Sequence, residues 1–515
     1  MPVSYPDRYA IYEFLDSLPQ DEQDEIFEFN IPKMYFLDIE TRIDINLGFP
    51  EAEDILDKEG NLVKEGAATE VLAISIVYDD KIFLLGLEEM SDTMKERIRV
   101  RTNEYFKPLE DNVEYKFKYL KYDDEFDMLY FFFNNMVPKM PLMTGWNFLN
   151  YDWLFLVNRS RKLVKYANGK EYRINPNISS PTRKLNKKWG AKYEEPSHRM
   201  IFDYMQLYEI ADTSIKVKES SSLDFVSGKL VGVNKIKYVN SIFKLNNSLS
   251  IKGYQFKEGE ILRPDLNAGN DVYYMYHELN RINITKEEFD KIKDNFTEIN
   301  VSDLQSLYDN DFEIYMYYNC VDSVLVQKIH EARDYISIIF AISSLAKIKI
   351  TDVISQMNGA LASLAITEGV LRNRFREQEN IVLFKDETRE KDNGTIAGGW
   401  VKEPLTGMNK WVVCYDFASL YPTTQRQFFI SPENFIGIQS PGNENVCTNG
   451  REITDEMVVC VNNAVFLKRR SPTIKMLEDV YADRKVNKKK MFVAMDELDI
   501  VQKEIKRLEK MLLDV

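Results

Sequence analysis

The chain has 515 residues, which is too many for one hydrophobic core and predicts several domains. Its net charge of −15 argues against a general nucleic-acid coat, although it permits an enzyme that meets DNA along a local basic lane. With three histidines and four cysteines that form no Cys-x-x-Cys pair, a His-rich zinc site or a Ser-His-Asp triad is not expected, so carboxylates must carry any metal chemistry.

The sequence also lacks the signals of membrane insertion. No apolar run approaches the roughly 20 residues that a membrane-spanning helix needs. The N-terminus has no basic region followed by an apolar stretch, as a signal peptide would. We therefore expect a cytoplasmic protein with reduced thiols and no membrane partner.

The first predicted elements are strands. Residues 34–40 form an apolar, strand-like run. Residues 71–78 and 82–85 predict a hairpin that turns at Asp79-Asp80. Residues 123–137 then have a helical pattern. Strands followed by alternating helices and strands indicate a mixed α/β domain that extends to about residue 335.

Later segments are less regular. Residues 159–196, which are rich in Lys, Arg, Asn and Pro, are expected to form an exposed insertion, and the similarly polar stretch 245–300 is expected to be rich in loops. Residues 336–376 have a mostly helical pattern, and residues 411–415 predict an apolar strand. At Ser471-Pro472, serine suits the N-cap and proline the first helical position, so a helix is expected to run from there to the C-terminus.

Three acidic motifs stand out in the first half. Asp38 and Glu40 lie two residues apart in a predicted strand, so their carboxylates share one face. Such a pair is costly without a cation, and a solvated edge strand is the alternative. Asp152 ends the apolar segment 145–152, where a turn or helix cap is the commoner use of aspartate. Tyr318 and Asp322 are four apart and share a helix face, as an ordinary surface pair also would.

Together and in this order, the motifs Asp-x-Glu, Asn-x-x-x-Tyr-Asp and Tyr-x-x-x-Asp resemble those of the DEDDy nucleases. The arrangement is similar to the proofreading domain of family B replicative DNA polymerases, which implies a ribonuclease-H-like fold. It also implies phosphodiester cleavage with two divalent metals about 3.5–4 Å apart. Hard Mg²⁺ ions prefer carboxylates, so the expected ligands are Asp38, Glu40, Asp152 and Asp322, with Asp38 bridging and Tyr318 orienting the attacking water.

A second motif lies at residues 412–423. It resembles the first polymerase motif of the same family, Asp-x-x-Ser-Leu-Tyr-Pro-Ser, with threonine in place of the last serine. A buried strand followed by a turn explains its apolar residues but not the whole match. The resemblance implies that Asp416 binds both Mg²⁺ ions of a polymerase site and that Tyr421 excludes a ribose 2′-hydroxyl. The incoming dNTP is expected to contact Ser419, Leu420 and Tyr421.

Two neighbouring segments extend the resemblance. Gly398, Gly399 and Lys402 are similar to the linker that touches the template strand. Arg484 and Lys488 are four apart, as are the two basic residues that grip the triphosphate in the first fingers helix of the family. A solvated basic helix face is the alternative. These features resemble the large tailed-phage branch of the family, which implies the cytoplasm of an infected host cell.

Other family motifs are not found. The sequence contains neither the Tyr-x-Asp-Thr-Asp-Ser hairpin, which carries the second metal-binding acid, nor the Lys-x-x-x-Asn-Ser-x-Tyr-Gly helix. We therefore expect the nucleotide-addition site to be incomplete in this sequence. Either a second polypeptide carries the remaining fingers, palm and thumb, or the sequence is a fragment. The C-terminal helix has an apolar stripe with heptad-like spacing, formed by Leu498, Val501, Ile505, Leu508 and Leu512. We expect this stripe to pack against a helix of a second polypeptide, and self-association is the alternative.

The predicted fold is α/β and multidomain: a ribonuclease-H-like 3′→5′ exonuclease domain, a partial α+β palm and a long fingers helix. The predicted domains are an N-terminal remnant (1–32), the exonuclease (33–335), a helical return of the N-terminal domain (336–380), the first part of the palm (381–470) and the first fingers helix (471–515).

The predicted function is that of a DNA polymerase component with proofreading activity. Its expected partners are primer-template and single-stranded DNA, dNTP, the second polypeptide and a sliding clamp. The alternatives are a stand-alone 3′→5′ exonuclease with a vestigial palm and a catalytically inactive DNA-binding replication subunit. Intact exonuclease motifs argue against the inactive subunit.

Overall fold

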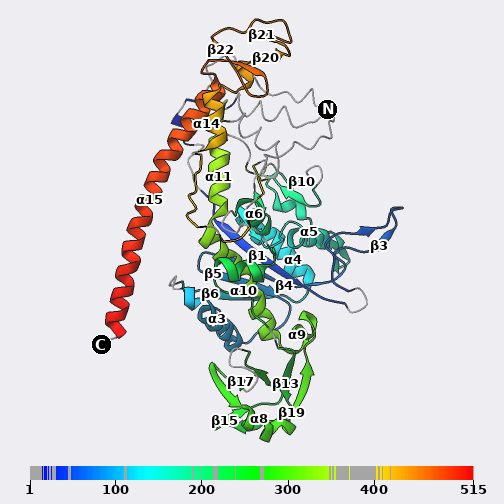
Figure 1. Cartoon of the computed structure of the whole chain (residues 1–515). Coiled ribbons are helices and arrows are strands. Elements are labelled where there is room, and N and C mark those ends of the chain that lie inside the picture. The colour runs from blue at the N-terminus through cyan, green and yellow to red at the C-terminus, as the bar shows by residue number, and fades with distance from the viewer. Residues whose placement is uncertain are drawn as a thin grey trace. The chain divides into compact units, whose positions relative to one another are not determined.

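The computed structural model describes most of the chain, apart from a few segments. The described residues are 31–44, 48–109, 113–187, 191–197, 199–212, 219–237, 239–266, 272–346, 406–408, 410–417 and 419–513, with single residues or pairs at 14, 17–19, 21–22, 25, 350, 353–354, 370–371 and 402–403. The chain divides into two compact units, Met1–Phe340 and Ala341–Val515 (Figure 1).

The first unit is built on a six-stranded sheet. Its strand order is β12-β7-β1-β4-β5-β6, in which β1 pairs antiparallel with β4 and parallel with β7. The strands are β1 (Met34–Thr41), β4 (Val71–Tyr78), β5 (Lys81–Gly86), β6 (Lys116–Lys121), β7 (Leu142–Gly145) and β12 (Met200–Asp203). The turn between β4 and β5 contains Asp79 and Asp80, which confirms the predicted hairpin.

The helices that contact strands of this sheet are α3 (Asp92–Phe106), α5 (Asp152–Lys162), α6 (Tyr204–Ala211) and α10 (Phe312–Arg333). Further helices of this part of the chain are α4 (Glu125–Phe131), α7 (Leu223–Leu230), α9 (Leu304–Asn310) and α11 (Tyr335–Ala346), of which α11 crosses the boundary between the two units. The buried helix α10 contacts β4 and β1, and the Ser75 hydroxyl on β4 donates to the Asn319 carbonyl oxygen at 3.1 Å. Large aromatic side chains such as Phe133, Phe148 and Trp153 fill the core beside the sheet. The mixed α/β prediction is confirmed.

The segment 159–196 carries short hairpins rather than loops alone. After α5 the strands are β8 (Val164–Ala167), β9 (Lys170–Arg173), β10 (Leu185–Lys187) and β11 (Glu194–Pro196). Another small hairpin comes earlier, from β2 (Ile55–Leu56) and β3 (Leu62–Lys64). The predicted exposure of this segment is confirmed for β9, in which every residue is exposed, whereas β8 is mostly half-buried.

A separate β subdomain occupies residues 241–300, where the sequence predicts loops, so that prediction is wrong. The sheet order is β18-β17-β16-β13-β19. Its elements are β13 (Ser241–Leu245), β14 (Leu249–Ile251), β15 (Tyr254–Phe256), β16 (Ile261–Pro264), β17 (Val272–His277), β18 (Asn280–Thr285), α8 (Lys286–Ile292) and β19 (Phe296–Asn300). The strands are half-buried: β18 buries only Ile282 and Ile284. Its polar outer face therefore has the composition of a loop.

This β subdomain has its own core and a narrow connection to the rest of the unit. Phe243, Phe256 and Phe289 are among its buried residues. Its first and last strands pair antiparallel from Ser241 opposite Asn300 onward, so the chain enters and leaves the subdomain at adjacent positions.

The second unit combines a small sheet with a long helix. The sheet order is β21-β20-β23-β22, and the elements are α14 (Leu420–Gln427), β20 (Phe435–Ser440), β21 (Asn443–Cys447), β22 (Met457–Val459), β23 (Ala464–Leu467) and α15 (Pro472–Leu513). The Ser471 hydroxyl accepts from the Ile474 N–H at 3.5 Å, which confirms the predicted helix start. The predicted strand at 411–415 is wrong. Residues 411–417 are exposed and belong to no strand, because no described strand pairs with them and satisfies their backbone groups.

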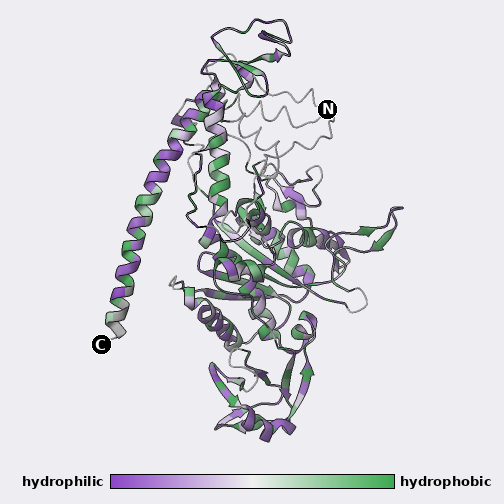
Figure 2. Ribbon diagram, in the orientation of Figure 1, coloured by the Kyte–Doolittle hydropathy of each residue, from purple (hydrophilic) through white to green (hydrophobic). Residues whose placement is uncertain are grey.

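Helix α15 exposes apolar side chains along its length, and Figure 2 shows hydrophobic and hydrophilic residues side by side on it. Leu498, Val501, Ile505 and Leu508 are each about half exposed, at 48–56%. The side chain of Leu512 lies outside the described residues. None of the described helices combines the length and apolar character that a membrane crossing needs.

Candidate functional site

Three acids from two distant motifs meet in the first unit. Asp38 and Glu40 project from one face of β1, and Asp322 projects from α10, which packs across that strand. One carboxylate oxygen of each acid lies within 4.8 Å of the other two. Glu40 and Asp322 are buried, with 9% and 4% exposure. In the described part of the chain this is the acidic group with the spacing of metal ligands.

The fourth predicted acid, Asp152, lies beside this group. Because β1 and β7 are parallel, the segment that follows β7 comes back next to the end of β1. Asp152 is the first residue of α5, is 3% exposed and accepts a hydrogen bond from the Ile39 N–H at 3.0 Å. Gly145 permits this close approach, since a Cβ there would overlap the Leu37 carbonyl oxygen of β1. We call Asp38, Glu40, Asp152 and Asp322 the acidic cluster.

The acidic cluster is electrostatically strained. Burial, and then the neighbouring Asp322 carboxylate, raise the pKa of Asp38 to about 7. Burial raises the pKa of Asp322 to about 6. Burial, and then the Asp38 carboxylate, also raise the pKa values of Glu40 and Asp152 well above their ordinary range. Ionising all four acids together is therefore unfavourable without added positive charge.

These donors fit a hard divalent cation. They are carboxylate oxygens, which Mg²⁺ prefers. Asp322 Oδ1 is buried and has no hydrogen-bond partner among the described residues, so a ligand-competent atom is available at the centre of the group. The structure thus brings Asp38, Glu40 and Asp322 together and Asp152 beside them, while their role as metal ligands stays a prediction.

Two residues of this site were missed by the sequence reasoning. Lys235, in the segment after α7, forms an ion pair with Asp322 Oδ2, and its Nζ lies 4.8 Å from the centre of the Tyr318 ring. Asn319 Nδ2 donates to Asp38 Oδ2 at 2.7 Å. Asn319 and Asp322 are three apart on α10, so helical spacing could have identified Asn319. No local signal marks Lys235, because only the fold brings it to the cluster.

Tyr318 lies at the edge of the acidic cluster. It is four residues before Asp322 on α10, as predicted, and is partly buried. Burial, and then the Asp322 carboxylate, raise the pKa of Tyr318 well above its ordinary value. Its hydroxyl is therefore protonated at neutral pH and can donate a hydrogen bond.

The predicted nucleotide site in the second unit is more open. Asp416 and Tyr421 are exposed, and Ser419 adopts a left-handed backbone conformation with φ 55° at the start of α14. The Ser419 hydroxyl accepts from Arg484 Nη1 of α15 at 3.4 Å, so two of the predicted nucleotide contacts lie together. Among the described residues, Asp416 belongs to no group of acids with metal-ligand spacing.

The remaining predicted contacts of this site lie on exposed surface or outside the described part. Lys402 and Leu420 are exposed, and Lys488 Nζ lies 5.5 Å from the centre of the Phe492 ring one turn along α15. Gly398 and Gly399 lie outside the described residues.

Comparison with known proteins gives two family matches. The model described as "DNA polymerase family B, exonuclease domain" matches residues 53–226, and the model "DNA polymerase family B" matches residues 362–509. Together they match more than half of the chain. The first match contains Asp152 but neither Asp38 nor Asp322, and the second contains Asp416 and Arg484.

Two phage proteins are similar to this chain. The DNA-directed DNA polymerase of Escherichia phage RB69 is 22% identical over 395 residues, which are 76% of this chain and 35% of that polymerase. The DNA-directed DNA polymerase of Enterobacteria phage T4 is 22% identical over 393 residues, which are 75% of this chain and 35% of that polymerase. The chain thus spans about a third of the length of these relatives.

Proposed function

This chain belongs to the family B DNA polymerases, and on that premise we propose that its first unit is a metal-dependent 3′→5′ exonuclease that hydrolyses the terminal phosphodiester of single-stranded DNA. The family implies a ribonuclease-H-like fold for this unit, and the mixed α/β sheet with α10 packed on β1 and β4 is consistent with it. The observation that carries the proposal is the convergence of Asp38, Glu40 and Asp322 within 4.8 Å.

In this proposal the acidic cluster holds two Mg²⁺ ions. When bound, the pair supplies activation of the attacking water and stabilisation of the leaving oxygen. Asp38 would be one of the residues that hold the ions, and Asn319 fixes the orientation of the Asp38 carboxylate through its 2.7 Å hydrogen bond. The protonated Tyr318 hydroxyl orients the attacking water. Lys235 steadies Asp322 and offsets part of the negative charge that gathers at the scissile phosphate.

We propose in addition that the second unit contributes to a DNA polymerase site. Asp416 would bind the catalytic Mg²⁺ ions, and Arg484 and Lys488 would grip the triphosphate of the incoming dNTP. The contact between Arg484 and the Ser419 hydroxyl supports this, because it joins α15 to the motif that carries Asp416. The further nucleotide contacts would come from Ser419, Leu420 and Tyr421, and the template contacts from Gly398, Gly399 and Lys402.

Nucleotide addition needs a second metal-binding acid. We propose that it comes from outside these 515 residues, on the same polypeptide or on another one, together with a helix that covers the apolar side chains of α15. A sliding clamp is a further proposed partner.

The exonuclease proposal is tested with single-stranded DNA labelled at its 5′ end. We expect the full chain with Mg²⁺ to give a ladder of shortened products, and Asp38→Ala to lower the rate at least about a hundredfold, because the two-metal site loses one of its ligands. The matched control is Asp92→Ala, since Asp92 is a 98% exposed acid of the same unit. Near-normal degradation by Asp38→Ala would refute the assignment.

A stand-alone exonuclease with a vestigial palm is the second candidate, favoured because Asp416 belongs to no group of three or more metal-ligand side chains in the described part of the chain. Primer extension separates the two. The chain is mixed with a polypeptide that carries an Asp-Thr-Asp-Ser hairpin, and extension that disappears in Asp416→Ala supports the polymerase proposal. No extension from the stoichiometric mixture supports the exonuclease alone.

A further inference from the structure

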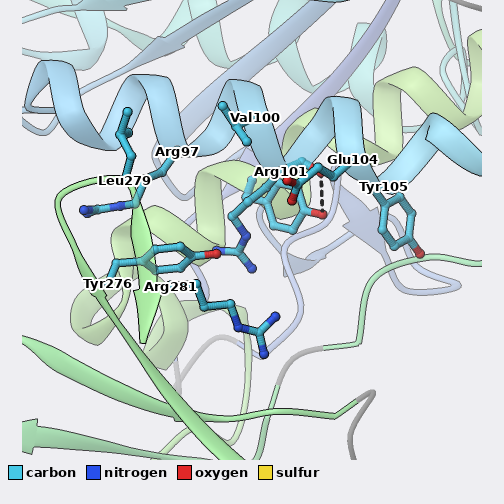
Figure 3. Close-up of a pocket in the computed structure, with 9 residues that line it drawn as sticks. Arg97, Val100, Arg101, Glu104, Tyr105, Tyr276, Leu279 and Arg281 are labelled. Atoms are coloured by element: carbon cyan, nitrogen blue, oxygen red, sulfur yellow. Dashed lines mark hydrogen bonds between the residues drawn. The ribbon is translucent and has the colours of Figure 1, made fainter. Parts of the chain in front are cut away.

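A cavity system lies between α3 and the β subdomain of the first unit. One cavity of about 390 Å³ and a second of about 400 Å³ share Arg101, Tyr105, Arg281 and Tyr317 in their walls. Figure 3 shows Arg97, Arg101 and Arg281 gathered with Tyr276 around the first cavity. We call the two cavities together the arginine groove.

The arginine groove is basic in an acidic protein. The chain has a net charge of −15, yet the basic residues that line the second cavity outnumber the acidic ones, Asp265 and Asp311. The rest of the protein is mostly acidic and repels anions. A local excess of positive charge therefore makes this groove the place where an anion of high charge density would bind. The basic residues are Arg101, Lys235, Lys237, Arg263 and Arg281.

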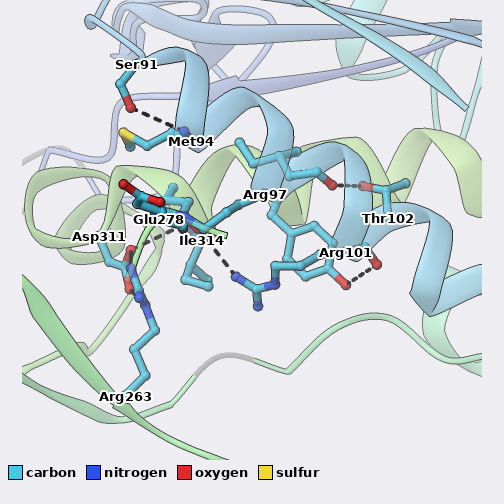
Figure 4. Close-up of polar contacts among 12 residues, drawn as sticks. Ser91, Met94, Arg97, Arg101, Thr102, Arg263, Glu278, Asp311 and Ile314 are labelled. Carbon is cyan, nitrogen blue, oxygen red and sulfur yellow. Dashed lines mark hydrogen bonds and ion pairs between the residues drawn. The ribbon is translucent and has the colours of Figure 1, made fainter. Parts of the chain in front are cut away.

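Most of these cations have an acidic partner within the fold, but not all of their N–H groups make hydrogen bonds. Arg263 is held by Asp311, with Nη2 2.7 Å from Oδ1 (Figure 4). Arg97 is held by Glu313, with Nη2 2.7 Å from Oε2. Arg101 Nη1 lies 3.9 Å from Glu313 Oε1, but it has no hydrogen-bond partner among the described residues, and its side chain is only 15% exposed. A buried guanidinium N–H that makes no hydrogen bond is costly, and a phosphate oxygen would satisfy it.

Tyrosine rings hold this arginine in place. The Arg101 guanidinium lies 4.4 Å from the centre of the Tyr317 ring and 5.6 Å from the centre of the Tyr276 ring. Arg281 lies 4.1 Å from the Tyr274 ring in the same way. Basic groups interleaved with aromatic rings are typical of grooves that follow a single nucleic-acid strand without regard to its sequence.

The arginine groove reaches the acidic cluster. Lys235 lines the second cavity, and its Nζ is paired with Asp322. Tyr317 lines both cavities and precedes Tyr318 on α10. A strand whose 3′ end lies at the cluster therefore finds the groove directly beside it.

Most of the residues that line the arginine groove come from a segment that neither family model matches. Arg263, Tyr276 and Arg281 lie on β16, β17 and β18, between the matches that end at residue 226 and begin at residue 362. Its role is therefore not assigned by the family comparison.

We propose that the arginine groove binds the sugar–phosphate backbone of the single strand whose 3′ end is cleaved at the acidic cluster. The inference rests on the proposed exonuclease function and names the path of its substrate. Arg101 donates to one phosphate from the floor, and Arg281 and Lys237 contact neighbouring phosphates from the subdomain side.

The test uses the full chain and two double variants. Lys237 is exposed and Arg281 is 39% exposed, so Lys237→Ala/Arg281→Ala removes two proposed phosphate contacts. Lys291→Ala/Lys293→Ala removes two exposed lysines of the same subdomain that line neither cavity. Because Arg281 pairs with Asp265, the single variant Lys237→Glu repeats the test without disturbing that pair.

Binding is measured by fluorescence anisotropy of a labelled 16-nucleotide oligothymidylate in EDTA, which does not depend on catalysis. We expect the groove variant to bind on the order of tenfold more weakly, with its salt dependence reduced by about 1.4 in log–log slope, because two phosphate contacts are lost. Lys237→Glu should weaken binding as well, and the control pair should bind like the wild type. Equal binding by the wild type and both groove variants would overturn the proposal.

Cleavage then separates the path of the strand from the reaction site. The p-nitrophenyl ester of thymidine 5′-monophosphate is small enough to occupy only the acidic cluster. We therefore expect the groove variants to cleave it with the kcat/KM of the wild type and to show a raised KM for the 16-mer. An equal loss of kcat/KM on both substrates would overturn the proposal that the groove is the path of the strand. So would inhibition by thymidine 5′-monophosphate that weakens as much as binding of the 16-mer does. If the wild type cleaves neither substrate, the proposed exonuclease function fails, and the anisotropy result alone decides the groove.

Discussion

Replacing Asp38 with asparagine should stabilise the metal-free protein at alkaline pH. Asp38 has a folded-state pKa of about 7 against an ordinary value of 3.8. The folded state therefore holds a proton that the unfolded chain releases, so the wild type loses stability as pH rises from about 4 to about 7. A shift of about three pKa units corresponds to at most about 4 kcal/mol, and we expect roughly 2–4 kcal/mol because the neighbouring acids titrate together.

The measurement is urea unfolding in EDTA, followed by intrinsic tryptophan fluorescence, to which Trp153, fully buried in the first unit, contributes together with the four other tryptophans of the chain. Asp38→Asn keeps an acceptor for Asn319 but cannot ionise, so its stability relative to wild type should be near zero at pH 4 and greatest at pH 8. Asp92→Asn, at an exposed site, should stay within about 0.5 kcal/mol of wild type at both pH values.

Magnesium should reverse the order of stability of the wild type and Asp38→Asn at pH 8. In the proposed function Mg²⁺ would bind the ionised cluster of the folded state only, so it should stabilise the wild type at pH 8 and have little effect on Asp38→Asn. An Asp38→Asn variant that is no more stable than wild type at pH 8 in EDTA would refute the argument that these acids are crowded and desolvated.

Two further outcomes are expected. In Lys235→Met the pKa values of Asp322 and Asp38 lose the cation that lowers them, so the acid limb of the pH–rate profile for oligonucleotide cleavage should move to higher pH. Cleavage should then fall more at pH 7 than at pH 9, and an equal fall at both would contradict this. Arg263→Met leaves the buried Asp311 unpaired and should cost about 3–5 kcal/mol in urea unfolding, while Arg263→Met/Asp311→Leu should recover much of it. A double variant less stable than the single one would count against that reasoning.

Local patterns predicted the strand that carries Asp38 and Glu40 and its neighbours. The run from Met34 to Glu40 is apolar apart from its two acids, and the Asp79-Asp80 turn joins two apolar strands, so all three strands could be placed from the sequence. Ser471-Pro472 marked the start of α15 because capping chemistry is local. The proximity of Asp38 and Asp322 could be expected only from the resemblance, since it depends on α10 packing across β1.

Features set by tertiary contacts could not be predicted in this way. Lys235 is one lysine among many until the fold pairs it with Asp322. The β subdomain was hidden because its strands alternate buried and exposed residues over short lengths. For segment 411–415 the error was the opposite one, because a strand was predicted where the structure has none. Its apolar composition favours a strand, but strand formation needs a neighbouring strand with free backbone groups.

The narrow connection of the β subdomain has a consequence for engineering. Val301 N–H donates to the Asn240 carbonyl oxygen at 2.8 Å, so the two ends of the excursion touch. A short turn could therefore bridge residues 240 and 301 and excise the module without rethreading the chain. This deletion would remove one wall of the proposed substrate path and leave the four acids of the acidic cluster in place. Binding of the DNA strand and cleavage of its phosphodiester could then be studied separately.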